Sequence, residues 1–442
     1  MQDSLLLKDI FKAYYDARKY TRNKSSQLSF EVALEDNLVE LYEDLKSRDY
    51  CPSPASCFIV KRPVCREVFS SEFRDRVVHH LLFNYIAPIF ERYMIYDSYS
   101  CRKGMGTSEG IRRCAHHIRS CTQNYTRRAY VLKLDLRGYF MSIDKDILYG
   151  IILSIMDRNN NWEGLDKDLV IFLLQKIIYR NVVDGCHKRG DEKDFEMVPI
   201  QKSLFSSKPG TGLPIGDLTS QLFSNIYLNE LDQFVKRDLK CRHYGRYVDD
   251  FYLVHEDKYY LLDCVEKIRL FLKERLHLTL HPNKITLQEC TMGLNFLGAY
   301  ICPFRNYASN RTVGYYRLAC KCIDRRCRFN ANIIYHDSIM KMCSVLNSYL
   351  GHLKQFRTGR IRQEGMKNNS IKWFCYTNGR VTKIKPSIYG YYVNNPDYCG
   401  VGRQIGDLSP ICSPERCKRR TLDDSQVRNP AGDSQSGSFA WM

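Results

Sequence analysis

Three aspartates stand out by the chemistry that their type and spacing allow. Asp135 lies in an apolar, β-branched run, YVLKLDL (130–136), and Asp249 and Asp250 stand together in RYVDDFYLV (246–254). Adjacent carboxylates repel each other unless a cation neutralises them, and Mg²⁺ prefers oxygen ligands of this kind. A solvated turn is the usual explanation for such a pair, but the aromatic and apolar residues on both sides would bury this one. The pattern favours phosphoryl transfer, which uses two divalent ions about 4 Å apart.

The elements that must position these aspartates follow from the apolar pattern. Residues 130–136 predict a strand, and the two apolar runs that meet at Asp249 predict a β-hairpin with the aspartates at its turn. Residues 218–239, after a Gly-Leu-Pro-Ile-Gly turn, predict one uninterrupted helix. Further expected elements are helices over 34–45, 77–85 and 261–272, two strands within 51–69, and a loop or hairpin excursion over 184–212.

The charge balance limits the class of partner. The chain has 442 residues, with 67 Lys and Arg against 49 Asp and Glu, which leaves a formal net charge of +18. A surplus of that size favours a polyanion, because each phosphate contact releases counterions. We place nucleic acid ahead of an anionic membrane surface, since no basic amphipathic anchor stands out. The 19 scattered cysteines and the lack of a signal peptide predict reduced thiols and a cytoplasmic location.

The positive charge is concentrated toward the C-terminus. Residues 311–385 hold 16 Lys or Arg against three acidic residues, with many aromatic side chains between them. Such a composition is typical of a surface that follows a phosphate backbone and stacks on bases, although a solvated helical domain with an aromatic core is the alternative. From about 408 the chain is rich in Ser, Pro and Gly, which predicts disorder.

Both aspartate motifs, in this order and about 115 residues apart, resemble those of the reverse transcriptases. Residues 73–107 resemble the finger-to-palm segment of the bacterial enzymes, and GLNFLGAYI (293–301) resembles their primer-grip hairpin. The resemblance covers roughly 20–350. It implies an α+β, right-hand polymerase fold. The implied domains are an N-terminal region with the fingers (1–120), a palm (121–305, with a finger insertion about 155–210), a basic helical thumb (306–390) and a partly disordered tail (391–442).

The same resemblance implies roles for individual residues. Asp135, Asp249 and Asp250 would be catalytic and would bind two Mg²⁺ ions, for which Mn²⁺ can substitute, together with the backbone carbonyl of Leu136. Phe140 would be the steric gate, because a large ring beside the sugar leaves no room for a 2′-hydroxyl; core packing is its alternative role. The remaining substrate-binding residues would be Lys61 and Arg66 on the finger strands, Lys284 in HLTLHPNKITL (277–287), and Ile215, Gly216 and Gln221.

The segment GLPIGDLTSQLFSNIYLNELD (212–232) favours one branch of the family. Most reverse transcriptases carry Pro-Gln-Gly here, whereas this chain has Ile215 before Gly216 and ends the motif with Ser-Gln, as in diversity-generating retroelements. That resemblance implies copying of a template-repeat RNA into cDNA, with errors concentrated at adenines, and a small basic oligomeric accessory protein as partner. Asp217 departs from the usual Asn and is expected to place an extra anion near the nucleotide site.

Two alternatives remain open at this point. A retron or group II intron-type reverse transcriptase would share the aspartates but not the Ile215 motif. A non-catalytic, maturase-like RNA-binding protein on the same scaffold would usually show a damaged carboxylate set, and here all three are intact.

Overall fold

The protein forms two compact units in a computed structural model, one ending at Met292 and one beginning at Gly293. The structure describes residues 2–386 except 20, 22, 62–63, 159–161, 163–164, 330–333 and 335, so the predicted C-terminal tail (391–442) lies outside the described residues. Within those ranges, every helix is too short or too polar to cross a membrane.

The centre of the first unit is a four-stranded sheet in the order β5-β6-β3-β7. All of its neighbouring strands are antiparallel. This confirms the predicted strand over 130–136 and the predicted hairpin around Asp249. The strands are β3 (Tyr130–Asp135), β5 (His243–Tyr247), β6 (Asp250–His255) and β7 (Thr286–Glu289).

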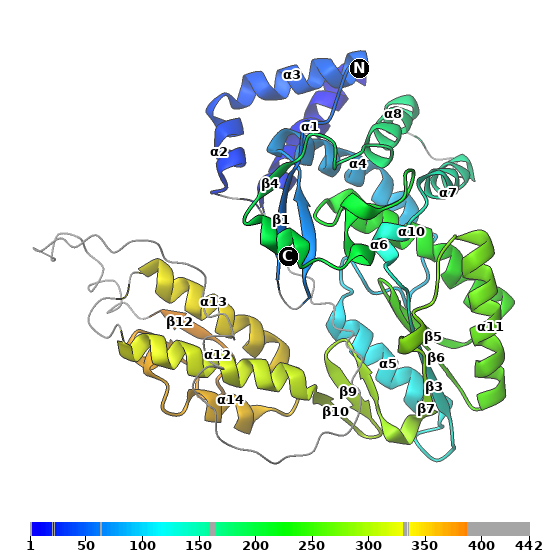
Figure 1. Ribbon diagram of the computed structural model, residues 1–442, viewed down its shortest axis with the longest axis vertical. Helices are drawn as coiled ribbons and strands as arrows, with labels where there is room; N and C mark the ends of the chain where they lie inside the picture. The colour runs from blue at the N-terminus through cyan, green and yellow to red at the C-terminus, as the bar shows by residue number, and fades with distance from the viewer. Residues whose placement is uncertain are drawn as a thin grey trace, which may run out of the picture. The chain divides into compact units, whose positions relative to one another are not determined.

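Alternation along β3 and β6 gives the sheet two different faces. Leu132 and Leu134 pair with Leu253 and Phe251, and all four side chains belong to the main core of the unit. Lys133 and Asp135 point to the opposite face, because successive side chains of a strand alternate. Helices α5 (Thr107–Cys121) and α11 (Lys258–Arg275) flank the sheet (Figure 1). Because the leucines of β3 pack into the core, its polar side chains lie on the opposite face of the sheet.

Helix α10 (Leu218–Gln233) continues into a π-helical turn, Phe234–Asp238. The predicted helix over 218–239 is therefore present, but its last turn changes geometry. The expected excursion over 184–212 contains short elements rather than a plain loop: β4 (His187–Arg189), α9 (Glu192–Glu196) and two 3₁₀ turns. The other helices of this unit are α1 (Gln2–Lys19), α2 (Ser25–Val32), α3 (Leu34–Ser47), α4 (Phe73–Glu91), α6 (Tyr139–Ser142), α7 (Lys145–Arg158) and α8 (Lys167–Ile178).

A second sheet in this unit, ordered β2-β1-β4, carries the predicted finger residues. Strands β1 (Ser56–Val60) and β2 (Arg66–Ser70) form the expected antiparallel pair. The loop before α10 joins this sheet, since the Phe69 amide donates to the carbonyl oxygen of Ile215 at 2.8 Å. The loop with the unusual isoleucine is thus attached to the strand that starts at Arg66.

In the described residues, the second unit combines a three-stranded sheet and a two-stranded sheet, β11-β12, with three helices. The three-stranded sheet, β10-β9-β8, includes the predicted hairpin of residues 293–301. The core of this unit is formed by side chains such as Tyr316, Leu346 and Leu350. The elements are β8 (Leu294–Phe296), β9 (Ala299–Cys302), β10 (Arg305–Ala308), α12 (Asn310–Phe329), α13 (His336–Leu353), α14 (Gly359–Met366), β11 (Cys375–Thr377) and β12 (Ile384–Pro386). With antiparallel pairing dominating both units, the expected α+β class is confirmed.

Candidate active site

The three aspartates converge at one end of the central sheet. In the β3–β6 ladder, Asp135 is directly opposite Asp250. Asp249 lies in the two-residue turn between Tyr247 and Asp250, which pair with each other. Cβ atoms of directly opposed residues are roughly 4.5–5.5 Å apart in such a ladder. The fold therefore places three carboxylates from two distant parts of the sequence side by side.

Two lysines face these carboxylates. The Lys284 ammonium, at the end of a 3₁₀ turn, lies 3.1 Å from each oxygen of Asp135. Lys133 Nζ lies 3.2 Å from Asp250 Oδ2. The other oxygen, Asp250 Oδ1, is buried without a hydrogen-bond partner. A buried carboxylate oxygen without a donor is costly, so this site is short of positive charge.

The raised pKa values of Asp249 and Asp250 also indicate that the site is short of positive charge. Burial, together with the charges of Asp135 and Asp250, raises the pKa of Asp249 from 3.8 to about 7. Burial also raises the pKa of Asp250 to about 6, although Lys133 counteracts it. Such shifts mean that the protein alone poorly stabilises the ionised carboxylates, and a bound cation would reverse this penalty.

These donors fit a hard divalent cation. Carboxylate oxygens are the ligands that Mg²⁺ selects, and Mg²⁺ keeps several waters, so few protein ligands are needed. No group of three His, Cys, Asp or Glu side chains in the described ranges is arranged closely enough to hold a metal ion alone. The Lys133 and Lys284 ammonium groups stand at the carboxylates instead. Leu136, whose carbonyl was the expected fourth ligand, is buried and bridges to Leu280.

The turn that carries Asp249 has an unusual backbone. Val248 has a φ of +55°, a left-handed conformation that a β-branched residue rarely adopts. Such a conformation costs roughly 1–3 kcal/mol and persists only where the surroundings enforce it. The Val248 carbonyl accepts a hydrogen bond from Arg246 Nη1 at 3.0 Å. The position of Asp249 thus depends on contacts made behind the turn.

The predicted triphosphate ligands have different surroundings. Lys61 is exposed, and its ammonium pairs with Asp194 at 2.6 Å. Arg66, half-buried at the start of β2, lies within electrostatic range of Lys202. Burial is the first cause that lowers the pKa of Lys202, and Asp135 and Asp249 counteract it. Lys202 is therefore a cation beside the site that the sequence did not indicate; it lies in the polar excursion, where no pattern marks single residues.

The predicted gate and loop residues lie on neighbouring segments. Phe140, in the short helix α6, is half-buried and packs against both the main core and a smaller core cluster that includes Cys57 and Phe69. Its carbonyl accepts from the Leu213 amide at 2.9 Å, which holds the start of the loop. Ile215 is half-buried against the same smaller cluster, and Gln221 accepts a hydrogen bond from the Cys101 thiol.

The carboxylate of Asp217, the residue that replaces the usual Asn, is buried and hydrogen-bonded. It is 5% exposed, and the Ser71 hydroxyl donates to its carboxylate at 2.7 Å. His79 Nε2 lies 3.7 Å from the same carboxylate. The residue therefore ties the start of α10 to the end of β2, a contact between segments about 146 positions apart that sequence spacing does not reveal.

The three aspartates lie within the segment that a protein-family model matches. A family model described as reverse transcriptase (RNA-dependent DNA polymerase) matches residues 66–301, more than half of the chain. The chain belongs to this family. It is accordingly an RNA-directed DNA polymerase, a nucleotidyltransferase, with the α+β right-hand polymerase fold. Reverse transcriptase domains generally use divalent metal ions.

Individual relatives are more distant. Protein YkfC of Escherichia coli K12 is 24% identical over 292 residues, covering 58% of this chain and 69% of that protein. Among solved structures, apo telomerase from Candida tropicalis truncated from its C-terminal domain has a TM-score of 0.42 at 13% identity, over 58% of this chain and 56% of that one. Telomerase from Candida albicans in complex with a fragment of telomeric RNA has a TM-score of 0.41 at 11% identity, over 77% of this chain and 60% of that one. This chain spans less than two thirds of either telomerase chain, and the family assignment rests on the sequence match.

Proposed function

We propose that this reverse transcriptase joins deoxynucleotides by a two-metal mechanism at Asp135, Asp249 and Asp250. The observation that carries the proposal is the β3–β6 register, which sets Asp135 opposite Asp250 and leaves Asp250 Oδ1 buried without a donor. Two Mg²⁺ ions, when bound, would stabilise the attacking and leaving oxygens of the phosphoryl transfer. The Leu136 carbonyl would complete the ligand set, and Mn²⁺ would substitute.

The chain's own residues would then divide the remaining work. Lys284 and Lys133, released from the carboxylates, together with Lys202 and Arg66, would neutralise the triphosphate. Phe140 would exclude the 2′-hydroxyl of ribonucleotides. We also propose that residues 1–120 form an N-terminal region with the fingers, that 121–305 form the palm with a finger insertion at about 155–210, and that 306–390 form a basic helical thumb.

We further propose that the enzyme serves a diversity-generating retroelement, copying a template-repeat RNA with adenine-directed errors. Ile215 supports this assignment, because an aliphatic side chain offers shape but no amide hydrogen bonds beside the nucleotide. A small basic oligomeric accessory protein would be its partner. Sequencing the cDNA that the purified protein makes from the adjacent non-coding RNA tests the proposal: accurate copying of adenines would contradict it, and RNA binding without extension would favour the non-catalytic alternative.

Replacing Ile215 by Gln should lower misincorporation at template adenines by about two- to tenfold, which corresponds to one hydrogen bond of about 0.5–1.5 kcal/mol. The backbone contact of the loop should survive, because it uses the Ile215 carbonyl and the Phe69 amide. Sequencing of primer-extension products on a defined RNA measures the change. Ile215→Leu is the matched control, since it adds no amide, and its error spectrum should stay that of the wild type. Equal error rates in both variants would refute the role.

The second unit offers a surface for single-stranded nucleic acid. A hollow beside α12 and α14 is lined by Arg328, Lys367, Asn368, Asn369, Ser370, Lys372 and Trp373. The Trp373 side chain is 60% exposed, so its ring is open to a stacking base. Arginine and lysine beside an exposed aromatic ring are the combination that binds phosphate and base together. We propose that template or displaced strand contacts this hollow.

Trp373→Ala should weaken binding of single-stranded RNA by about fivefold or more, since one stacked base contributes roughly 1–3 kcal/mol. Fluorescence anisotropy of a labelled oligonucleotide measures the affinity, and Lys372→Gln should reduce the salt dependence by about one counterion. Trp162→Ala in the first unit is the control and should leave the affinity unchanged. An equal effect of both tryptophan substitutions would remove the hollow from the binding surface.

A further inference from the structure

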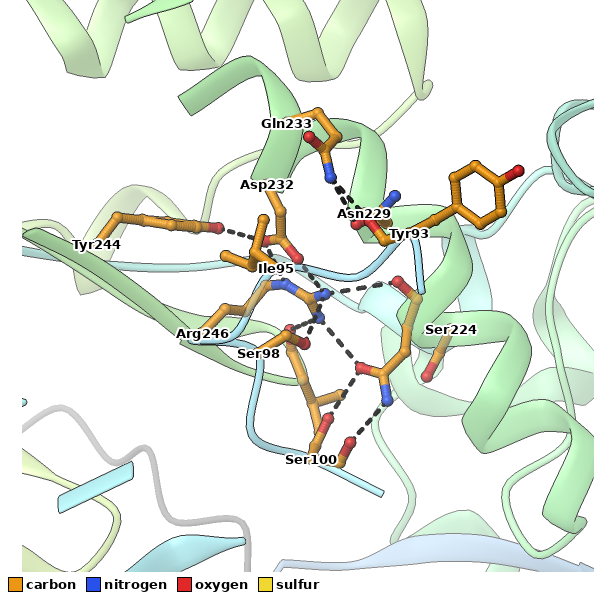
Figure 2. A network of polar contacts seen from close by, with 12 residues as sticks. Tyr93, Ile95, Ser98, Ser100, Ser224, Asn229, Asp232, Gln233, Tyr244 and Arg246 are labelled. Atoms are coloured by element: carbon orange, nitrogen blue, oxygen red, sulfur yellow. Dashed lines mark hydrogen bonds and ion pairs between the residues drawn. The ribbon is translucent and has the colours of Figure 1, made fainter. Parts of the chain in front are cut away.

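Arg246 is a fully buried cation in β5, two residues before the strained Val248. Its exposed fraction is 0%, as is that of its partner Asp232 on α10. Arg246 Nε donates to Asp232 Oδ1 at 2.7 Å and Nη2 donates to Oδ2 at 2.6 Å, which makes the ion pair bidentate. The Tyr244 hydroxyl donates to the same carboxylate, and Figure 2 shows these groups pointing toward one another. The charge of Arg246 is therefore fully matched inside the protein.

The guanidinium of Arg246 also donates to three other residues. Nη1 donates to Asn225 Oδ1 at 3.2 Å and to the Val248 carbonyl at 3.0 Å. Nη2 donates to Ser98 Oγ at 3.2 Å. The backbone of Arg246 also exchanges hydrogen bonds with residues 97 and 99. One guanidinium thus connects α10, the segment around Ser98 and the turn that carries Asp249.

A stabilising ion pair alone would not need this arrangement. Buried ion pairs are weak evidence for stability, because well-packed apolar side chains often replace them without loss. A guanidinium, unlike an ammonium, can hold a carboxylate on one edge while a separate N–H reaches a carbonyl. The carbonyl that it reaches belongs to Val248, whose left-handed conformation needs support from its surroundings. The contact therefore indicates that the hydrogen-bond network of Arg246 stabilises the turn at Val248.

We propose that Arg246 is a positioning residue: it holds the Val248 turn in its left-handed conformation and so sets where the Asp249 carboxylate lies relative to Asp135. The inference rests on the proposed function, in which these carboxylates bind metal ions. Through Asp232, the same link fixes the hairpin against α10, whose first turn carries Gln221. The β5–β6 hairpin and the first turn of α10 would thus keep a fixed position relative to each other.

Arg246→Lys tests this role, because lysine keeps the positive charge but lacks the planar guanidinium that contacts Asp232 and the Val248 carbonyl together. We expect Mn²⁺ affinity, measured by electron paramagnetic resonance of unbound Mn²⁺ without RNA or nucleotide, to fall by about tenfold, equivalent to about 1.4 kcal/mol. The rate of primer extension should fall with it, while RNA affinity should stay near that of the wild type. Unchanged Mn²⁺ affinity in the folded variant would overturn the inference.

Val248→Gly supplies the second arm of the experiment. Glycine adopts positive φ without strain, so a glycine turn should no longer depend on the guanidinium. In the Arg246→Lys background, Val248→Gly should therefore recover Mn²⁺ affinity by about threefold or more. If Arg246→Lys alone does not fold, Val248→Gly is compared with the double variant. These two should bind Mn²⁺ within about threefold of each other, and a tenfold gap would overturn the inference.

Arg102→Lys is the matched control. Arg102 is also nearly buried, with a side chain 8% exposed, and it pairs with Glu91 and donates to the Ile95 and Ser98 carbonyls. This substitution should lower the melting temperature without changing Mn²⁺ affinity. An equal loss of affinity in Arg102→Lys would make the effect a general loss of stability. If the wild-type protein binds no Mn²⁺, the proposed metal site itself is wrong. That result differs from the one that would overturn only the role of Arg246.

Discussion

Asp249→Asn should abolish nucleotide incorporation and, at the same time, stabilise the metal-free protein. Removing a group that acts on transition-state charge costs up to roughly 10³-fold in rate, and a carboxamide carries no charge for a cation. Primer extension with Mg²⁺ on an RNA template measures the loss. The gain in stability follows because the Asn replaces a carboxylate that burial and two neighbouring anions disfavour.

The pH dependence of that gain has a definite sign. The pKa of Asp249 is raised on folding from 3.8 to about 7, so its ionisation removes stability as the pH rises through this interval. In thermal melts with EDTA, the difference between Asp249→Asn and wild type should grow from about pH 4 to about pH 7 and then level off. Asp263→Asn, at an exposed pair with Lys267, should show no such trend. A destabilised Asp249→Asn at pH 8 would contradict the account.

Gly216→Ala should destabilise the first unit by roughly 2–4 kcal/mol. Gly216 has a φ of +137°, and a Cβ there would lie 2.0 Å from the carbonyl oxygen of Phe69, a backbone atom that cannot rotate away. The clash would push the loop off β2, where the Ile215 carbonyl accepts from the Phe69 amide. We expect the melting temperature to fall by about 5–10 °C and the KM for nucleotide to rise.

Gly190→Ala separates the clash from the cost of the backbone conformation. Gly190 has a comparable φ of +116°, but its added Cβ would meet nothing within 4 Å. That variant should lose only about 1 kcal/mol, because the strain is present without the collision. Equal melting temperatures for Gly190→Ala and Gly216→Ala would show that the loop does not pack tightly against β2.

The elements around the site could be predicted because their apolar patterns are strong. The strand that ends at Asp135 and the hairpin at Asp249 both follow from residues that must be buried, and the fold class followed from them. The apolar pattern predicts the strand and the hairpin that carry Asp135 and Asp250, but it does not predict the register that pairs these two residues. Strand alternation places Lys133 on the same face as Asp135, so the pattern alone indicates this partner of Asp250.

Other features depend on contacts that one sequence does not reveal. Arg246 and Asp232 meet only because β5 and α10 pack together. Lys202 comes near the aspartates from an excursion without periodicity, and Asp217 accepts a hydrogen bond from Ser71, which lies on a distant segment. Nothing in the residue type of Val248 suggests positive φ, which glycine or asparagine would favour. Tertiary packing decided each of these positions.

The convergence of three carboxylates on shared metal ions can be tested by locating the ions on the chain. Fe²⁺ bound in place of Mg²⁺, given ascorbate and hydrogen peroxide, produces hydroxyl radicals that cut the backbone nearby. We predict cuts in two separate segments, one at the end of β3 near Asp135 and one at the β5–β6 turn near Asp249. Excess Mg²⁺ should suppress both cuts, and Asp249→Asn should weaken both together. Cutting at only one segment, or cutting that Asp249→Asn leaves unchanged, would contradict a shared metal site.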